Sequence, residues 1–253
     1  MSSLKYDKKL MQEDPLFALH KFALPHIGKD YDTFRILHVG ESNYLGQDPK
    51  RKTDKYGIPF FAEKWWNTEY SIEDLMRRDP DTHWDGDWTR NVIKEFESGI
   101  SDFFDLYAAM GKALLKLEFP NIECTEKNIR EYYGRYFAFT DYYKMPSLYT
   151  GSNIVTSLSL ARKKLTEEEK SKYPARSFNR ENKRQAEMAL DAVIKVLEPK
   201  IIIVTSTKAM NDYKGKYKDK MMHIYHPSSK RYGYFRQEEL EEKLEKALRE
   251  YKN

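Results

Sequence analysis

Apolar residues along the chain alternate between short continuous runs and longer stretches with helical spacing. The short runs fall at residues 34–39, 136–140, 200–205 and 221–225. The run at 200–205 is the clearest, because it is rich in β-branched residues and follows Pro199. We expect each short run to form a buried strand.

Three longer stretches predict helices. They are residues 88–119, with a break near Gly99 or Gly111, residues 182–197 and residues 237–251. Strands that alternate with helices are typical of a mostly parallel sheet covered on both faces. We therefore predict an α/β fold, a three-layer αβα arrangement around a mostly parallel four-stranded central sheet. One domain is the simpler interpretation of 253 residues, and two smaller domains are the alternative on length alone.

Two long stretches, residues 42–87 and 142–180, show no regular pattern. Loops of that length are usually functional or mobile, and both follow predicted strands, so they would overhang the edge of the sheet where ligands bind. The first contains an insertion at about residues 62–90 with four tryptophans and an acidic run, Trp65, Trp66, Trp84, Trp88, Asp79, Asp81, Asp85 and Asp87. We interpret it as a helical excursion packed on the domain. The alternatives are a lid, a partner surface or a metal site, and the carboxylates lack the ordered spacing of a calcium loop.

Composition narrows the class of protein. The net charge of +4 permits contact with phosphate without establishing it. The single cysteine, Cys124, cannot form an internal disulfide, a four-cysteine zinc site or a cysteine-ligated iron-sulfur cluster. Neither a signal peptide nor an apolar run long enough for a membrane span is present in the sequence. We expect a cytoplasmic protein without membrane association.

The first candidate motif follows the first predicted strand and comprises Gly40, Glu41, Ser42, Asn43 and Tyr44. Glycine permits a tight exit and close approach of a ligand to the backbone. Glu41 and Asn43 supply an acceptor and an amide that can orient a water molecule. The alternative is an ordinary strand-to-helix turn with a polar cap.

Two further motifs also follow predicted strands. In residues 223–229, His226 is held by a proline and two serines, and its neutral imidazole can donate to a carbonyl oxygen on which negative charge develops. The alternative is a helix N-cap with an incidental histidine. In residues 139–146, Asp141 stands at a strand end among aromatic residues, and the alternative is a solvated turn beside core tyrosines.

The order and spacing of these motifs resemble the uracil-DNA glycosylase superfamily, and within it the branch that usually carries an iron-sulfur cluster. Residues 39–42, Val-Gly-Glu-Ser, resemble its Gly-Glu-Ala-Pro-Gly loop, and residues 57–60, Gly-Ile-Pro-Phe, resemble its Gly-Arg-Pro-Phe segment. Residues 139–144 are similar to its Ile-Thr-Asn-Val-Val-Lys strand end. Residues 198–204 are similar to its Arg-Pro-Lys-Val-Ile-Val junction, and residues 225–228 to its His-Pro-Ser loop. Each match is short, and the ordered set is more specific than any member.

The resemblance implies a protein that rotates a base out of the DNA duplex and hydrolyses its N-glycosidic bond. Its active site would be built from the loops around residues 40–44, 140–144 and 226–229. Glu41, or Asn43 nearby, would orient the attacking water, and His226 would donate to the base oxygen. The base would be bound by Gly40, Ser42, Tyr44, Phe60, Asp141 and Ser228, with Phe60 stacking on it. The DNA backbone would be contacted, or the space left by the flipped base filled, by Ser229, Lys230, Arg231 and Tyr232. The alternative for Lys230 and Arg231 is that they are ordinary solvated charges.

The chain departs from the family pattern in three places. The cluster cysteines are missing, so we expect no iron-sulfur cofactor. Asn43 and Tyr44 replace a proline and a glycine, and the tyrosine could narrow the pocket. Asp141 stands where the family uses asparagine, and an ionised carboxylate only accepts hydrogen bonds. We therefore expect Asp141 to shift preference toward a base edge with two adjacent donors, such as that of guanine, or to mark lost activity.

The sequence thus leaves two functional hypotheses. The first is a DNA base glycosylase, a DNA repair hydrolase without a cofactor, whose base need not be uracil. The second is a protein on the same fold that binds nucleic acid or a nucleotide without turnover. A generic nucleotide-binding protein is disfavoured because no glycine-rich phosphate loop is present in the sequence. The lesion and the pathway are not given by the sequence, and for the oligomeric state we expect a monomer.

Overall fold

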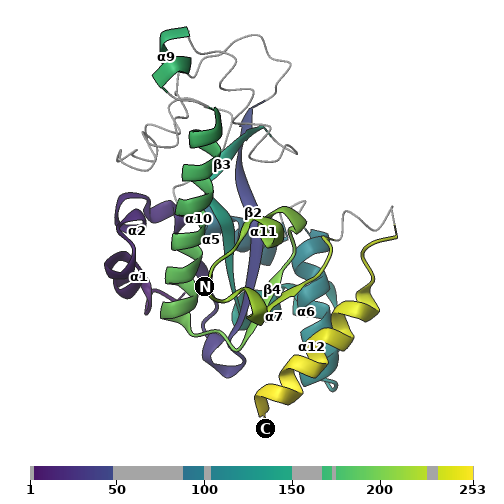
Figure 1. The fold of residues 1–253 in the computed structure, drawn as a ribbon. Coiled ribbons are helices and arrows are strands. Elements are labelled where there is room, and N and C mark those ends of the chain that lie inside the picture. Colours follow the sequence, from purple (N-terminus) through teal and green to yellow (C-terminus); the bar gives the residue numbers. More distant parts are fainter. Residues whose placement is uncertain are drawn as a thin grey trace.

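The protein has an α/β fold built on a mixed five-stranded sheet (Figure 1). The computed structural model describes residues 3–47, 88–99, 104–149, 167–172, 175–226 and 233–252. The strand order is β1-β3-β2-β4-β5. The strands are β1 (His26–Ile27), β2 (Ile36–Gln47), β3 (Phe137–Tyr149), β4 (Ile201–Val204) and β5 (Met221–His223).

Four of these strands, β2 to β5, are parallel, and each contains or overlaps one of the four predicted runs. β2 is central: Ile36 pairs with Phe137 of β3 and with Ile201 of β4. The fifth strand, β1, pairs antiparallel with β3. The prediction of a four-stranded sheet is therefore wrong by one edge strand, because a strand of two residues leaves no periodic signal in the sequence.

β2 and β3 also extend further than their apolar runs. Beyond the core, Gly40 pairs with Asp141 and Ser42 pairs with Tyr143, and pairing continues with register shifts to Gln47 and Tyr149. The prediction that residues 40–44 and 140–144 form loops is therefore wrong. These residues lie in strands because the two strands satisfy each other's backbone groups past the end of the apolar runs, and in β3 Tyr142 and Tyr143 are still buried in the core.

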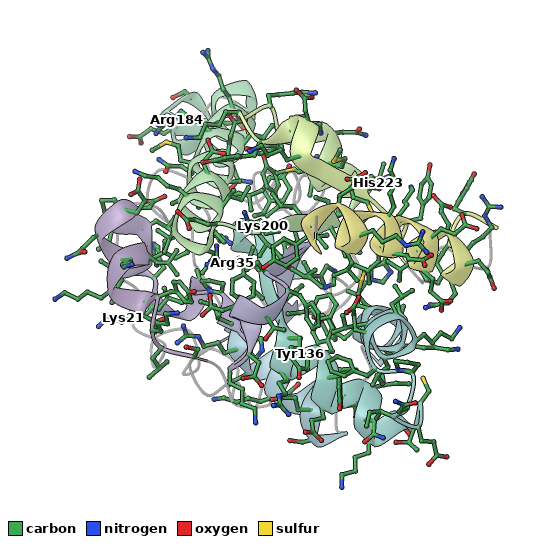
Figure 2. The ribbon with its side chains drawn as sticks, turned by 90° about the horizontal axis from the view of Figure 1, so that it is seen from below. Lys21, Arg35, Tyr136, Arg184, Lys200 and His223 are labelled. Carbon is green, nitrogen blue, oxygen red and sulfur yellow. The ribbon has the colours of Figure 1, made fainter. Side chains whose placement is uncertain are left out.

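Helices cover both faces of the sheet. On one face, α1 (Asp7–Glu13), α2 (Pro15–Leu19), α10 (Ala175–Leu197) and α11 (Thr207–Asp212) share an apolar cluster with Leu37, Val39 and Ile202 of the strands. On the other face, α5 (Trp88–Ser98), α6 (Phe104–Glu118), α7 (Glu126–Tyr136) and α12 (Gln237–Lys252) pack against Ile36, Phe137 and Ile203. The same division is visible from below in Figure 2, where Arg35 and Lys200 mark the amino-terminal ends of β2 and β4.

The predicted helices are present, with changed boundaries. The stretch at 88–119 divides at Gly99, whose φ of 80° ends α5, whereas Gly111 lies inside α6. A Cβ atom at Gly111 would lie 2.5 Å from the main-chain oxygen of Ile129, so this glycine allows α6 to approach α7 closely. Helix α10 begins seven residues before the predicted start at residue 182. Of the predicted insertion at 62–90, only residues 88–90 are described, and they open α5.

Helices α1, α2, α7 and α9 (Glu167–Lys172) are not predicted by the apolar pattern, and neither are the 3₁₀ turns η1 (Lys21–Ala23), η2 (Tyr31–Thr33) and η3 (Lys218–Lys220). In α7 the local signals are present: Thr125 caps its amino terminus through Asn128, and Ile129, Tyr133 and Tyr136 are buried on one face. Among the described residues, none of the helices is long and apolar enough to cross a membrane.

Candidate functional site

Three of the predicted segments lie together at the carboxyl edge of the sheet, defined as the level at which β4 and β5 end while β2 and β3 continue past them. Gly40 of β2 lies beside Asp141 of β3, and the backbone N–H of Thr205, just after β4, donates to Val39 of β2 at 3.0 Å. The chain after β5 still follows β4, since Ile224 donates to Val204 at 3.0 Å. In an α/β sheet, ligands bind at the carboxyl ends of strands whose connections leave in opposite directions, here β2 and β4.

Asp141 is the most unusual group at this edge. Its side chain is 5% exposed, and its Oδ2 atom has no hydrogen-bond partner among the described residues. Its Oδ1 atom lies so close to Gly40 that a Cβ atom at Gly40 would be 2.7 Å away. A buried polar atom without a partner lowers the stability of the folded protein by about 1–3 kcal/mol. We therefore expect a ligand or a water molecule to bind the Oδ2 atom. The neighbouring Ser42 Oγ is also buried without a partner in the described part of the chain.

The protonation of Asp141 is set mainly by burial. Burial raises the pKa of Asp141 to about 7, the charge of Lys144 lowers it, and the charge of Glu41 raises it. Burial also lowers the pKa of Lys144 to about 8, although Asp141 and Asp14 raise it. The Lys144 Nζ atom donates to the Thr140 hydroxyl and to the main-chain oxygen of Asp141. Asp141 can therefore hold or release a proton near neutral pH.

Glu41 is held in place from β4. The Ser206 hydroxyl donates to its Oε2 atom at 2.9 Å, and the same hydroxyl accepts from the Ala209 N–H at 3.0 Å as the N-cap of α11. The side chain of Glu41 is half-buried. This arrangement fixes the carboxylate between β2 and the carboxyl end of β4, where an acceptor can orient a water molecule.

Beneath this edge lies a buried polar chain through His38. His38 Nδ1 lies 2.7 Å from the Tyr133 hydroxyl, and His38 Nε2 lies 2.9 Å from the Thr205 hydroxyl, which donates to the Val39 main-chain oxygen. The imidazole therefore carries its proton on Nε2 and accepts at Nδ1. Burial lowers the pKa of His38 to about 3, and the charge of His226 contributes to the same shift.

The predicted site residues divide into three groups. The structure brings together Gly40, Glu41, Ser42 and Asp141, and places His226 just beyond β5 near His38. Asn43 and Tyr44 are strand residues of β2, and only their backbone is described. The remaining predicted residues lie outside the described residues: Phe60, Ser228, Ser229, Lys230, Arg231 and Tyr232.

Several residues of this edge are missed by the sequence argument. Ser206 and Thr205 follow β4, so the reasoning about strand ends that selected Glu41 and Asp141 would also have selected them if applied to the run at 200–205. His38 interrupts an apolar run, which is a weaker signal. Tyr133 leaves no signal, because its contact with His38 joins residues 95 positions apart.

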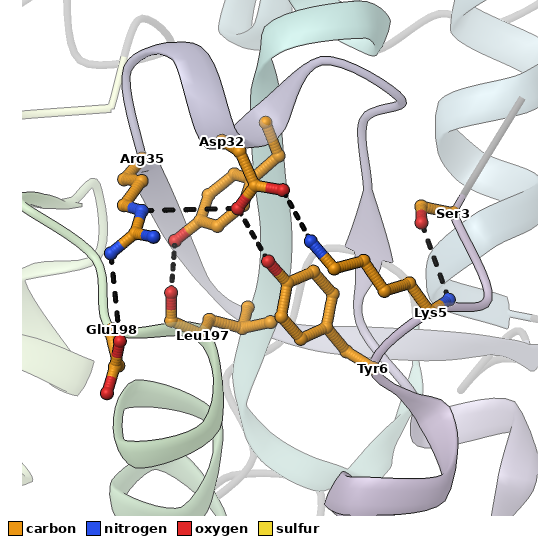
Figure 3. A network of polar contacts seen from close by, with 8 residues as sticks. Ser3, Lys5, Tyr6, Asp32, Arg35, Leu197 and Glu198 are labelled. Atoms are coloured by element: carbon orange, nitrogen blue, oxygen red, sulfur yellow. Dashed lines mark hydrogen bonds and ion pairs between the residues drawn. The ribbon is translucent and has the colours of Figure 1, made fainter.

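A second polar cluster lies at the opposite, amino-terminal end of the sheet and lines a hollow of about 650 Å³ (Figure 3). Its charges pair with one another: the Lys5 ammonium lies 2.7 Å from Asp32, and the Arg35 guanidinium lies 3.6 Å from Glu198. The Tyr6 hydroxyl donates to Asp32 at 2.6 Å. These pairs join the residues just before α1, η2 and the turn between α10 and β4, so we assign them a structural role.

No family model, curated protein or solved structure matches this chain. Within the described ranges, no group of three or more histidine, cysteine, aspartate or glutamate side chains is arranged to hold a metal ion. The residues at the carboxyl edge of the sheet are therefore the candidate functional site.

Proposed function

We propose that the protein is a DNA base glycosylase that flips a base into the carboxyl edge of the sheet and hydrolyses its N-glycosidic bond. The observation that carries this proposal is the buried Asp141 carboxyl group with its unpartnered Oδ2 atom, one strand away from Glu41. A flat heterocycle with polar edges supplies the partner that this atom lacks. The proximity of His226 to His38 supports the same site.

The chemistry assigns one task to each group. Glu41 orients a water molecule and accepts its proton as the water oxygen attacks C1′ of the deoxyribose. The bond from C1′ to the base nitrogen breaks, and its electron pair moves onto the base. The imidazole N–H of His226 donates to the base oxygen on which that charge collects. Asp141 holds the pairing edge of the base.

The arrangement of sheet and helices is compatible with the proposal but less specific than the site residues. Helices on both faces of a parallel β3-β2-β4-β5 core fit a three-layer αβα fold of the uracil-DNA glycosylase type. The mildly basic chain is compatible with DNA as the partner. In this proposal the backbone of the DNA is contacted by residues 229–232, which lie outside the described residues.

Replacing His226 tests the proposal. Single-turnover base release is measured with duplexes that contain uracil, hypoxanthine or xanthine. For the duplex that is cleaved, His226→Ala is expected to slow release by about 10²-fold, because a hydrogen-bond donor to the developing charge is removed. His223→Ala is the matched control: His223 lies in β5, 3.3 Å from the Thr207 hydroxyl, and we assign it no part in the reaction.

Two outcomes would contradict the proposal. Equal rates for His226→Ala and the wild-type protein would remove His226 from the reaction. Salt-sensitive DNA binding without base release from any duplex would favour the second hypothesis, a protein that binds nucleic acid without turnover.

A further inference from the structure

From the surroundings of its carboxyl group we infer that Asp141 meets the base as a neutral carboxylic acid, and that the site takes bases whose pairing edge carries one donor beside one acceptor. The inference rests on the proposed function and names its substrate class. It also changes the expectation drawn from the sequence, which treated Asp141 as an ionised, accept-only group.

The position of the carboxyl group favours the neutral form. The side chain is more than nine-tenths buried, and its Oδ1 atom is pressed against Gly40, where only glycine leaves room. Its Oδ2 atom has no partner in the described part of the chain. An ionised carboxylate in such a place needs hydrogen-bond donors or a cation directed at its oxygens.

The charged and titratable groups around Asp141 do not supply that support. On its own strand, the Lys144 ammonium donates to the Thr140 hydroxyl and the Asp141 main-chain oxygen, and the Asp141 Oδ2 atom has no partner among the described residues. From β2, Glu41 adds a like charge. Helices α6 and α7 present the phenols of Tyr107 and Tyr133, whose pKa values are raised by burial and by the charge of Asp141.

The two histidines near the site complete this environment. His38 is neutral, because burial lowers its pKa to about 3. His226 lies beyond β5 and is near enough to His38 to affect its titration. Among the described residues, the charge of Lys144 favours the ionised form of Asp141, and burial together with Glu41 opposes it, which raises the pKa of Asp141 to about 7.

The neutral form of Asp141 changes which base edges the site can bind. A protonated carboxyl group offers one O–H donor and retains an acceptor, as an asparagine amide does. It complements the carbonyl and adjacent ring N–H of uracil, hypoxanthine or xanthine. The ionised form accepts only, and matches an edge with two adjacent donors. Preference for a donor-acceptor edge should therefore be lost as Asp141 ionises.

The first test is a pH profile with a matched variant. Single-turnover release of uracil and hypoxanthine is measured between about pH 5.5 and 8.5 for the wild-type protein and for Asp141→Asn. The wild-type rate is expected to fall by about tenfold for each pH unit above the titration of Asp141. Asp141→Asn should lack this fall, because its amide keeps a donor and an acceptor at every pH. Parallel profiles for the two proteins would overturn the inference.

The second test measures the protonation of Asp141 independently of base release. Infrared difference spectra between the wild-type protein and Asp141→Asn at about pH 6 should show the carbonyl stretch of a protonated carboxyl group. Base release without this signal overturns the inference and leaves the proposed function standing. The signal without base release from any duplex overturns the proposed function, and with it the substrate class.

Discussion

Asp141→Asn is expected to unfold less readily than the wild-type protein above neutral pH. Burial raises the pKa of Asp141 to about 7 in the folded protein, against 3.8 for the free group, so the folded state binds the proton more tightly. The stability that this proton contributes is present at low pH and is lost as pH rises through about 7. The charge of Lys144 already lowers the pKa of Asp141 and is included in this balance, so we expect the variant to gain free energy of unfolding on the order of a few kcal/mol above neutral pH.

Urea unfolding at about pH 5 and pH 8.5 checks this prediction. The gain in free energy of unfolding should be largest at the higher pH and clearly smaller at the lower one, because the unfolded aspartate already loses its proton above its pKa of 3.8 whereas the folded one keeps it up to about 7. Asp219→Asn, a change at an exposed aspartate of η3, is the control and should behave alike at both pH values. A variant that is less stable than the wild-type protein at the higher pH would contradict the prediction, because it would show that the fold stabilises the ionised Asp141 carboxylate.

Glu41→Gln is expected to abolish most base release while leaving DNA binding and folding intact. Glutamine keeps an oxygen that can accept from Ser206, so the contact across β2 and β4 survives. It cannot take the proton of the attacking water, and loss of such a group costs about 10²–10⁴-fold in rate. Single-turnover rates and fluorescence anisotropy with the same duplex measure the two effects separately.

The matched control for Glu41 is Glu238→Gln, an exposed glutamate in the first turn of α12. Its rate should equal that of the wild-type protein. A Glu41→Gln variant that releases base at the wild-type rate would contradict the assignment of Glu41, and would transfer the orientation of the water to Asn43 or to another group.

The four parallel strands are predictable from the sequence because each carries a continuous apolar run that the core requires. The run at 200–205 corresponds closely to β4 (Ile201–Val204), and residues 221–225 contain β5. The extensions of β2 and β3 are not predictable in this way. They depend on pairing between Gly40 and Asp141 and beyond, and backbone pairing does not require apolar side chains.

The candidate site, too, is predictable from the sequence only in part. The closeness of Glu41 and Asp141 follows from the parallel pairing of two strands that the apolar runs predict, although both residues lie within these strands and not after them. The protonation of Asp141 does not follow from its residue type, because it is decided by burial within the fold and by the charges of Lys144 and Glu41. The contact between Glu41 and Ser206 also joins distant parts of the chain, 165 positions apart.

A crystal structure of Glu41→Gln bound to a duplex that contains the cleaved base tests the central claim most directly. We expect the base to be extruded from the stack, with its pairing edge about 2.6–3.2 Å from the Asp141 carboxyl group and its carbonyl oxygen within the same range of the His226 imidazole. A complex in which the base stays stacked, or in which the DNA contacts a different face and leaves Asp141 Oδ2 without a partner, would contradict the account.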